Sequence, residues 1–294
     1  MLPTLRQLQY LRLLAEHGSF SRAAEAAHVS QPALSAGVQE LERVLGAPVV
    51  ERARGGVVLT PVGEEAVRRA GDVLARTEDL VDAARTAGKP LSGRFRLGVI
   101  PTVAPFLLPQ VLPRLKAEFP ALRLYLREDL TGKLSTALKA GALDAAVIAL
   151  PHDMAGLDHA PIGWDDILAV APADHPIARG KAVAPGGLAQ SDLILLEDGH
   201  CLRDQALAAC NLEAPKGEDV FAATSLHTLV QMVGSGLGVS FVPQMAVRAG
   251  LTDSDRVAVR PLGGTARRQI VIAWRTGSSR EREARLLAEA LKFD

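Results

Sequence analysis

The stretch GSFSRAAEAAHVSQPALS, residues 18–35, decides the fold of the N-terminal region. Gly18 suits the C-terminal turn of a preceding helix, whose leucines recur at intervals of three. Ser21 can cap a short alanine-rich helix, and Ser30 followed by Pro32 is the pattern that begins another helix with one apolar stripe. Two helices joined by a short turn, the second of which begins Ser-Gln-Pro, predict a helix-turn-helix.

Beyond this motif the sequence predicts a β-hairpin and then a long helix. Two β-rich runs, 49–52 and 57–59, flank Gly55-Gly56 and are typical of a small hairpin, or wing. Thr60-Pro61 restarts a helix. In it, small and apolar residues recur every three or four positions at Val67, Ala70, Leu74, Thr77, Val81 and Ala84. Such a seam favours a helix that dimerises, and packing on its own domain is the alternative.

After a linker at 88–93, strand and helix patterns alternate to the C-terminus. The expected strands lie around 95–99, 122–126, 145–150, 193–196, 239–242 and 270–274, and the expected helices around 103–118, 130–140, 201–210, 225–234 and 280–292. This alternation predicts an α/β architecture with ligands at the carboxyl ends of strands. Because about 200 residues is large for one sheet, we expect two lobes with a cleft.

The composition is that of a globular protein and excludes several classes. The 294 residues carry 33 basic and 33 acidic side chains, so no net charge draws the chain to nucleic acid or to an acidic membrane. Two cysteines are too few for a disulfide-dense secreted scaffold or a four-thiolate metal site. No apolar run reaches the roughly 20 residues of a membrane span, and the N-terminus is unlike a signal peptide. We therefore expect a cytoplasmic protein without a metal or other cofactor.

The helix-turn-helix places polar side chains where they would meet DNA. The candidate DNA contacts are Ser30, Gln31, Pro32, Ser35, Arg52 and Arg54. The first four begin the second helix, which enters a major groove in such motifs, and the two arginines lie in the wing, within reach of phosphates or a minor groove. Charge does not decide the matter, since residues 1–60 hold six basic and five acidic side chains. The alternative is a three-helix domain whose polar residues are solvated.

The two cysteines, Cys201 and Cys210, suggest redox chemistry. Cys201 falls at the expected N-terminus of a helix, beside His200 and Arg203, and such a position favours the thiolate that peroxide attacks. If 201–210 is one helix, its ends lie about 13.5 Å apart, whereas a disulfide tolerates at most about 7 Å between Cα atoms. The pair is therefore either two inert thiols or a switch whose oxidised state has a different fold.

Four N-terminal runs resemble LysR-type transcription regulators. They are LRQLQY (5–10), GSFSRAA (18–24), VSQPALS (29–35) and LTPVG (59–63). The resemblance implies double-stranded promoter DNA as a partner, a two-lobed effector domain similar to periplasmic binding proteins, and usually a tetramer, with RNA polymerase as a further candidate partner. We expect a winged helix-turn-helix at 1–60, a dimerising linker helix and hinge at 61–90, and an effector domain at 91–294. Lobe I is expected over about 91–164 plus 269–294, and lobe II over about 165–268.

A second resemblance concerns the cysteines. The run GHCLRDQ at 199–205, with Cys210 downstream, resembles the sensing segment of the OxyR hydrogen-peroxide regulators. The match implies that Cys201 is the peroxidatic thiol, oxidised first to sulfenic acid, and that Cys210 is the resolving thiol that then forms a disulfide with it. The residues it implies in holding hydrogen peroxide or promoting its cleavage are Thr102, Thr131, His200, Asp204 and Arg268. Hydroxyls can orient a small oxidant, and a cation can stabilise charge on the leaving oxygen.

Structural alternatives exist for several of these residues. Thr131 can cap a helix, Arg268 can lie at the surface, and His200 can satisfy a loop hydrogen bond. The glycine-rich run at 234–238 precedes a strand, whereas a phosphate cradle follows one, so we expect a turn there.

The resulting hypothesis is a peroxide-sensing, DNA-binding regulator that is not an enzyme. The alternative within the same class is a LysR-type regulator that binds a small organic effector in the cleft between the lobes. A thiol peroxidase would consume peroxide catalytically, but the helix-turn-helix within 1–60 argues against it. A solute-binding module conflicts with the absent export signal and with the seam at 67–84.

Overall fold

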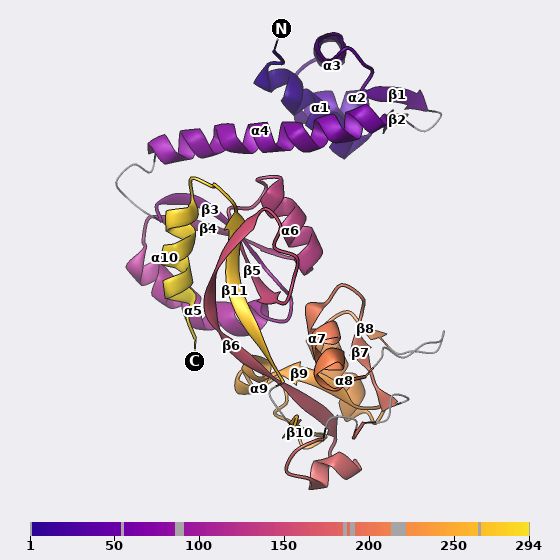
Figure 1. Ribbon diagram of the computed structural model, residues 1–294, viewed down its shortest axis with the longest axis vertical. Helices are drawn as coiled ribbons and strands as arrows, with labels where there is room; N and C mark the ends of the chain where they lie inside the picture. The colour runs from indigo at the N-terminus through magenta and orange to yellow at the C-terminus, as the bar shows by residue number, and fades with distance from the viewer. Residues whose placement is uncertain are drawn as a thin grey trace. The chain divides into compact units, whose positions relative to one another are not determined.

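The computed structural model describes residues 2–53, 56–85, 91–184, 187–188, 192–212, 222–263 and 266–293. The chain divides into two compact units, an N-terminal unit built on Met1–Ala87 and an effector unit that holds most of the remainder (Figure 1). No helix in these ranges combines the length and the apolar character that a membrane span needs.

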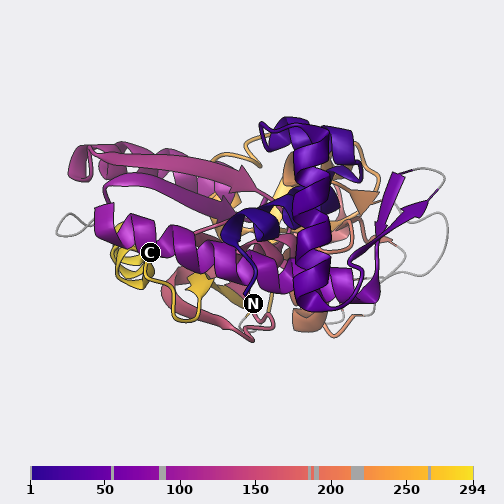
Figure 2. The same ribbon diagram turned by 90° about the horizontal axis from the view of Figure 1, so that it is seen from above.

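The N-terminal unit is a three-helix domain followed by a hairpin and a long helix. Its elements are α1 (Leu5–His17), α2 (Phe20–Ala26), α3 (Gln31–Leu45), β1 (Val50–Ala53), β2 (Gly56–Leu59) and α4 (Pro61–Arg85). Gly18 and Gly46 end α1 and α3 in the left-handed conformation, and the Ser30 hydroxyl accepts a hydrogen bond from Ala33 N at the start of α3. Figure 2 shows the hairpin of β1 and β2, in purple, projecting from the indigo helices. The predicted helix-turn-helix and wing are confirmed.

The start of α2 differs from the prediction. Ser19 occupies the N-cap and Ser21 lies in the first turn, so the expectation that Ser21 caps this helix is wrong. Phe20 packs against the core of the N-terminal unit as the first helical residue, which moves the helix start to that position.

Gly63 lets α4 begin close against the hairpin. A Cβ atom at this position would lie 1.9 Å from the carbonyl oxygen of Val49. Thr60 secures the same junction, since its hydroxyl donates to Pro48 O at 2.8 Å and accepts from Gly63 N at 3.0 Å. The close packing at the junction between β2 and α4 therefore depends on Thr60 and Gly63 of the run LTPVG.

The apolar seam of α4 is used in two ways. Ala70 and Leu74 are buried in the core formed with α1–α3, as the alternative interpretation of the seam has it. Val73, Leu80 and Val81 on the same helix are exposed. The first half of the seam thus stabilises its own unit, and apolar side chains remain exposed farther along the helix.

The effector unit is a mixed sheet covered by helices. In chain order its elements are β3 (Gly93–Val99), α5 (Ala104–Glu118), β4 (Leu122–Glu128), α6 (Thr131–Lys139), β5 (Ala145–Leu150), β6 (Leu157–Pro172), the 3-10 helix η1 (Pro176–Arg179), β7 (Leu195–Leu196), α7 (Cys201–Ala209), β8 (Ala222–Ala223), α8 (Leu226–Gly234), β9 (Ser240–Pro243), α9 (Gln244–Arg248), β10 (Val257–Pro261), β11 (Arg267–Arg275) and α10 (Glu281–Leu291). The seven-stranded sheet has the order β10-β6-β11-β5-β3-β4, and β9 pairs with β6. Its buried strands, among them 145–149 in β5 and 270–274 in β11, form the core.

Two long strands join the lobes. The first part of β6 pairs antiparallel with β11, and its last residues pair with β9 and β10. Figure 1 shows β6 and β11 running from the lobe with α5, α6 and α10 to the lobe with α7, α8 and α9. The five predicted helices of this unit are confirmed to within a residue or two, whereas β6, β10 and α9 were not predicted.

Candidate functional site

The helix α7 carries one cysteine at each end. Cys201 is its first residue, and Cys210 caps its last turn with its N–H directed at Ala206 O at 3.1 Å. Both thiols are free. The expectation of one continuous helix is confirmed, and nine residues of α-helix separate the Cα atoms by about 13.5 Å. Because a disulfide spans at most about 7 Å, the two thiols cannot join while α7 is intact.

The environments of the two thiols differ. Cys201 is half-buried and lines a cavity, whereas Cys210 is only 2% exposed and lies in the apolar core. Burial raises the pKa of the Cys210 thiol, because an apolar surrounding disfavours the thiolate. Cys201 is therefore the thiol that a solute can reach first.

The Cys201 pocket, a cavity of about 560 Å³, lies between elements of both lobes. Thr131 begins α6, Leu150 and Pro151 end β5, Cys201, Asp204 and Gln205 lie on α7, and Arg267 begins β11. Since β3, β4 and β5 run parallel, the residues that follow them meet at one edge of the sheet. Thr131, Leu150 and Pro151 therefore lie at the edge of the sheet where these parallel strands end.

Two polar atoms of this pocket have no partner in the described part of the chain. They are the buried Thr131 Oγ1 and Gln205 Oε1. Gln205 Nε2 donates to Leu150 O at 3.0 Å, which fixes the side-chain amide. Thr131 does not cap α6 through its hydroxyl, so the capping alternative is wrong. A buried polar atom without a partner costs roughly 1–3 kcal/mol, which makes both atoms suited to bind a small polar molecule.

His200 precedes α7 as its N-cap residue and is buried. Burial lowers the pKa of its imidazole, against an opposing effect of Glu197, so the ring is predominantly neutral at pH 7. The guanidinium of Arg203 forms an ion pair with Asp198.

Thr102 and Arg268 contact each other. Arg268 Nη1 donates to Thr102 Oγ1 at 2.7 Å, and Nη2 donates to Thr102 O at 3.1 Å. Arg268 also forms an ion pair with Asp165 at 2.9 Å, with both side chains buried. The alternative of a surface arginine is wrong, because Asp165 lies directly opposite Arg268 in the pairing of β6 with β11 and supplies the countercharge.

The other candidate surface is the start of α3. Gln31 and Pro32 are exposed and Ser35 is half-exposed, so they lie on the outer face of the second helix of the motif. Ser30 is also exposed, but its hydroxyl caps the helix. Arg52 lies in β1; its side chain and the whole of Arg54 lie outside the described residues.

Comparison with known proteins identifies the family. The family described as "Bacterial regulatory helix-turn-helix protein, lysR family" matches residues 5–64, and the "LysR substrate binding domain" matches residues 88–293. The regulator OxyR of Escherichia coli K12 is 39% identical over 289 residues, covering 98% of this chain and 94% of its relative. The chain belongs to the OxyR group of the LysR family. Its effector unit is accordingly the two-lobed α/β domain of LysR regulators.

Two further matches extend over almost the whole chain. The HTH-type transcriptional regulator EstR of Acinetobacter baylyi is 39% identical over 292 residues, which is 99% of this chain and 97% of EstR. A full-length OxyR variant from Pseudomonas aeruginosa has a TM-score of 0.79 at 36% identity and covers 99% of this chain and 98% of that structure. The similarity to these relatives therefore extends over both units of the chain.

The structure divides the implied peroxide-binding residues of this LysR regulator into groups. Thr131 and Asp204 line the pocket with Cys201, Thr102 and Arg268 form a buried pair, and His200 is the N-cap next to Cys201. Sequence reasoning missed Gln205 and Arg267. Gln205 could have been predicted from the sequence, since residues four apart share one face of a helix and Gln205 follows Cys201 by four.

Proposed function

We propose that this protein is a hydrogen-peroxide-sensing transcription regulator that is switched by oxidation of Cys201. The observation that carries the proposal is the Cys201 pocket, where a reachable thiol lies with the unpartnered Thr131 Oγ1 and Gln205 Oε1. Hydrogen peroxide has two O–H donors and two acceptor oxygens, which match such atoms. Relatives that are named "Hydrogen peroxide-inducible genes activator" support the same ligand.

The first step oxidises Cys201. Its thiolate sulfur attacks one peroxide oxygen, an S–O bond forms, and the O–O bond breaks. The second oxygen leaves as hydroxide and takes a proton to become water, so that the sulfur loses two electrons and becomes sulfenic acid. Thr131 and Gln205 orient the peroxide. Thr102, His200, Asp204 and Arg268 complete the proposed peroxide-binding set.

The second step converts this local change into a change of fold. The thiolate of Cys210 attacks the sulfenic sulfur, an S–S bond forms, and hydroxide leaves and is protonated to water. Since the intact α7 holds the sulfurs too far apart, this step requires α7 to unwind and Cys210 to leave the core. The effector unit thereby acquires two discrete states.

The DNA-binding part of the proposal rests on α3. The side chains that meet base edges in the major groove of promoter DNA are Gln31, Pro32 and Ser35. Ser30 caps α3 by accepting a hydrogen bond from the helix backbone. The phosphates are contacted by Arg52 and Arg54 of the wing. We propose residues 1–60 as the DNA-binding domain, 61–90 as the dimerising linker and 91–294 as the sensing domain of a homo-oligomer. Oxidation would change the spacing of the paired DNA-binding domains.

The test is a peptide map of the oxidised protein. Reduced full-length protein receives one equivalent of hydrogen peroxide, remaining thiols are blocked, and the peptides are analysed by mass. We expect a Cys201–Cys210 cross-link in the wild type, a trapped sulfenic acid in Cys210→Ser, and no oxidation in Cys201→Ser. Two unreacted wild-type thiols would overturn the proposal.

One observation favours a second function. The Cys201 pocket, at about 560 Å³, falls within the range of roughly 300–1,000 Å³ of small-molecule sites. A small organic effector bound there would regulate the protein without oxidation. In that case Cys201→Ser would leave induction by the effector unchanged in a reporter assay, whereas the peroxide proposal requires induction by peroxide to be lost.

A further inference from the structure

The proposed oxidation of Cys201 requires a proton to move. The thiol loses its proton before the sulfur attacks, and the hydroxide that leaves gains one. His200 precedes Cys201 in the chain, but the described residues that line the Cys201 pocket do not include it. Burial lowers the pKa of the His200 imidazole, so this ring holds few protons at pH 7. A different side chain is therefore better placed to carry the proton.

His152 lines the Cys201 pocket and belongs neither to the proposed peroxide-binding set nor to the DNA-binding surface. It lies two residues beyond the end of β5, across the pocket from the helix α7 that Cys201 begins, and its side chain is half-buried. Imidazole is the side chain that ordinarily gains and loses a proton between about pH 5 and 8. The pocket thus contains both a thiol and an imidazole.

Ser135 holds the His152 ring. Its Oγ atom lies 2.8 Å from His152 Nε2, and Ser135 is buried on α6. A hydroxyl both donates and accepts hydrogen bonds, so this bond can form whether or not Nε2 carries a proton. Ser135 also follows Thr131 by four residues on α6, so the partner of His152 and the unpartnered Thr131 Oγ1 share one helix face. The ring is therefore held in both of its protonation states.

The other titratable or charged side chains near His152 are acids and strong bases. Apart from the Cys201 thiol they are Asp204 on α7, Arg267 on β11, the exposed Asp153 next in the chain and the exposed Lys133 on α6. Carboxylic acids ordinarily titrate near about pH 4, and the cations of lysine and arginine above about pH 10. His152 is therefore the side chain among them that is suited to exchange a proton at neutral pH.

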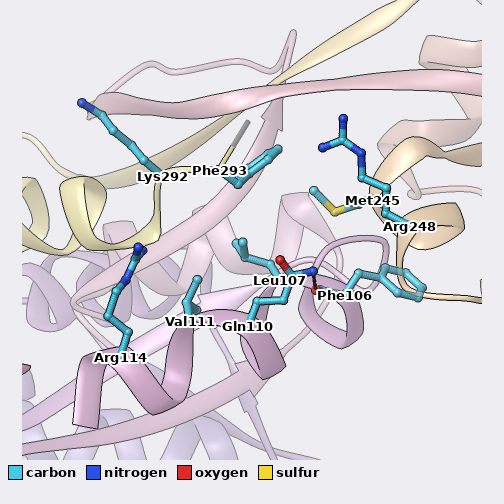
Figure 3. Close-up of a pocket in the computed structure, with 9 residues that line it drawn as sticks. All are labelled: Phe106, Leu107, Gln110, Val111, Arg114, Met245, Arg248, Lys292 and Phe293. Carbon is cyan, nitrogen blue, oxygen red and sulfur yellow. Dashed lines mark hydrogen bonds between the residues drawn. The ribbon is translucent and has the colours of Figure 1, made fainter. Parts of the chain in front are cut away.

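A second cavity of the effector unit differs from the Cys201 pocket in this respect (Figure 3). It has a volume of about 320 Å³, and its cationic lining residues are Arg114, Arg248 and Lys292. Its described lining residues include no histidine, cysteine or acid. Of these two cavities, only the Cys201 pocket therefore has described lining residues that combine a thiol with an imidazole.

We infer that His152 is the acid–base residue of the Cys201 pocket, which takes the thiol proton of Cys201 and passes it to the oxygen that leaves when hydrogen peroxide is cleaved. The inference rests on the proposed function and assigns the proton transfer within it. It adds to the proposed peroxide-binding set a residue that changes its own protonation state during the reaction.

The step balances without a further reactant. The His152 imidazole takes the Cys201 thiol proton, and the thiolate sulfur attacks one peroxide oxygen. The S–O bond forms as the O–O bond breaks, so that the sulfur is oxidised by two electrons and the peroxide is reduced. The imidazolium then gives its proton to the leaving hydroxide, which becomes water. Thiol and hydrogen peroxide have become sulfenic acid and water, and the imidazole is neutral again.

The first test is the rate at which reduced full-length protein loses the Cys201 thiol after stopped-flow mixing with hydrogen peroxide. His152→Gln removes the titrating ring but keeps an amide that can bond Ser135. We expect the rate at pH 7 to fall by at least about tenfold, since general acid–base catalysis contributes roughly 10²–10⁴-fold. The exposed His159→Gln is the control and should react at the wild-type rate. A thermal melt of each variant checks that it is folded.

The pH profile of this rate distinguishes proton transfer from a structural role. Thiolate with imidazolium holds as many protons as thiol with imidazole, so the wild-type rate should change little between about pH 6.5 and 8. In His152→Gln the thiol loses its proton to solvent, so the rate should rise with pH, by up to about tenfold per unit. Parallel profiles for the two proteins overturn the inference.

Chemical rescue provides a second readout. His152→Ala enlarges a cavity of about 560 Å³, which can then admit free imidazole. We expect added imidazole to raise the rate of this variant saturably and to leave the wild type unchanged. A loss of rate that imidazole does not restore overturns the inference, as does an undiminished rate in His152→Gln, and in both cases the proposed function stands. A wild-type Cys201 that peroxide does not oxidise would overturn the proposed function and this inference with it.

Discussion

Arg268 and Asp165 lie directly opposite each other in the pairing of β11 with β6, and the guanidinium contacts Asp165 Oδ2 through Nε at 3.1 Å and Nη2 at 2.9 Å. The same two side chains reach Thr102, just before α5, and the backbone of Met245 in α9. Since the strands that carry them run through both lobes, this ion pair joins the two lobes at their crossing.

Loss of the Arg268 side chain should destabilise the effector unit strongly. Arg268→Gln leaves the buried Asp165 carboxylate without its countercharge, and we expect the free energy of unfolding to fall by about 3–5 kcal/mol. Urea unfolding followed by tryptophan fluorescence measures this, because Trp164 and Trp274 both lie in the effector unit. Arg127→Gln, which breaks the exposed pair with Asp129, is the control and should cost less than about 1 kcal/mol. Equal losses in the two variants would contradict the role given to the buried pair.

Some elements of this fold could be predicted from the sequence and others could not. The N-terminal unit was predictable because its signals are local: Gly18, Ser30 and Pro32 set helix ends within a few residues of themselves. The same holds for α7, whose bounds agree with the predicted ones. The strand β6 was not predictable, since Pro161, Gly163 and three aspartates interrupt its apolar pattern, and it is stabilised by β9, β10 and β11 far along the chain.

The residues of the candidate site likewise include some that could be predicted from the sequence and some that could not. The resemblance to the OxyR regulators implied one site for the two cysteines and Thr131, and the structure brings Thr131 and Cys201 to one pocket. The burial of Arg268 could not be predicted, because its partner Asp165 is 103 residues away and meets it only through the strand register. The neutral state of His200 likewise depends on burial, which a run of seven residues does not reveal.

Removal of the Thr131 hydroxyl should separate its chemical role from its structural role. Thr131 Oγ1 is buried without a partner, so Thr131→Val should leave the protein at least as stable as the wild type. If the hydroxyl orients peroxide, the rate at which Cys201 is oxidised should fall by roughly ten- to a hundredfold. Stopped-flow mixing with peroxide, followed by thiol quantification, measures the rate. Thr136→Val on the same helix, where the hydroxyl donates to Gly132 O at 2.9 Å, is the matched control and should react at the wild-type rate. An unchanged rate in Thr131→Val would remove this residue from the proposed peroxide-binding set.

The buried His200 should make the effector unit less stable in mild acid. Its pKa in the folded protein is lowered by burial, so below pH 6.5 the unfolded chain binds a proton that the folded chain does not. The stabilisation is therefore present above pH 6.5 and is lost as the pH falls towards and through the lowered pKa. Urea unfolding at several pH values between 5 and 7.5 should show a steeper loss in the wild type than in His200→Asn. The exposed His159→Asn should follow the wild type, and identical profiles for all three proteins would show that His200 is not the group responsible.

The start of α3 offers a sharp test of base recognition, because neighbouring residues there have different roles. Gln31 is exposed and free of the capping interaction, whereas the Ser30 hydroxyl is engaged with Ala33 N. Gln31→Ala should weaken binding to a duplex selected by the wild-type protein by about tenfold and leave binding to an unrelated duplex unchanged, since one base contact contributes roughly 1–3 kcal/mol of discrimination. Ser30→Ala should instead lower the stability of the domain by about 1 kcal/mol through loss of the cap. Fluorescence anisotropy on both duplexes measures the first effect, with the exposed Gln39→Ala of the same helix as control. If Gln31→Ala weakens both duplexes equally, the residue contacts the DNA backbone and another side chain of α3 selects the sequence.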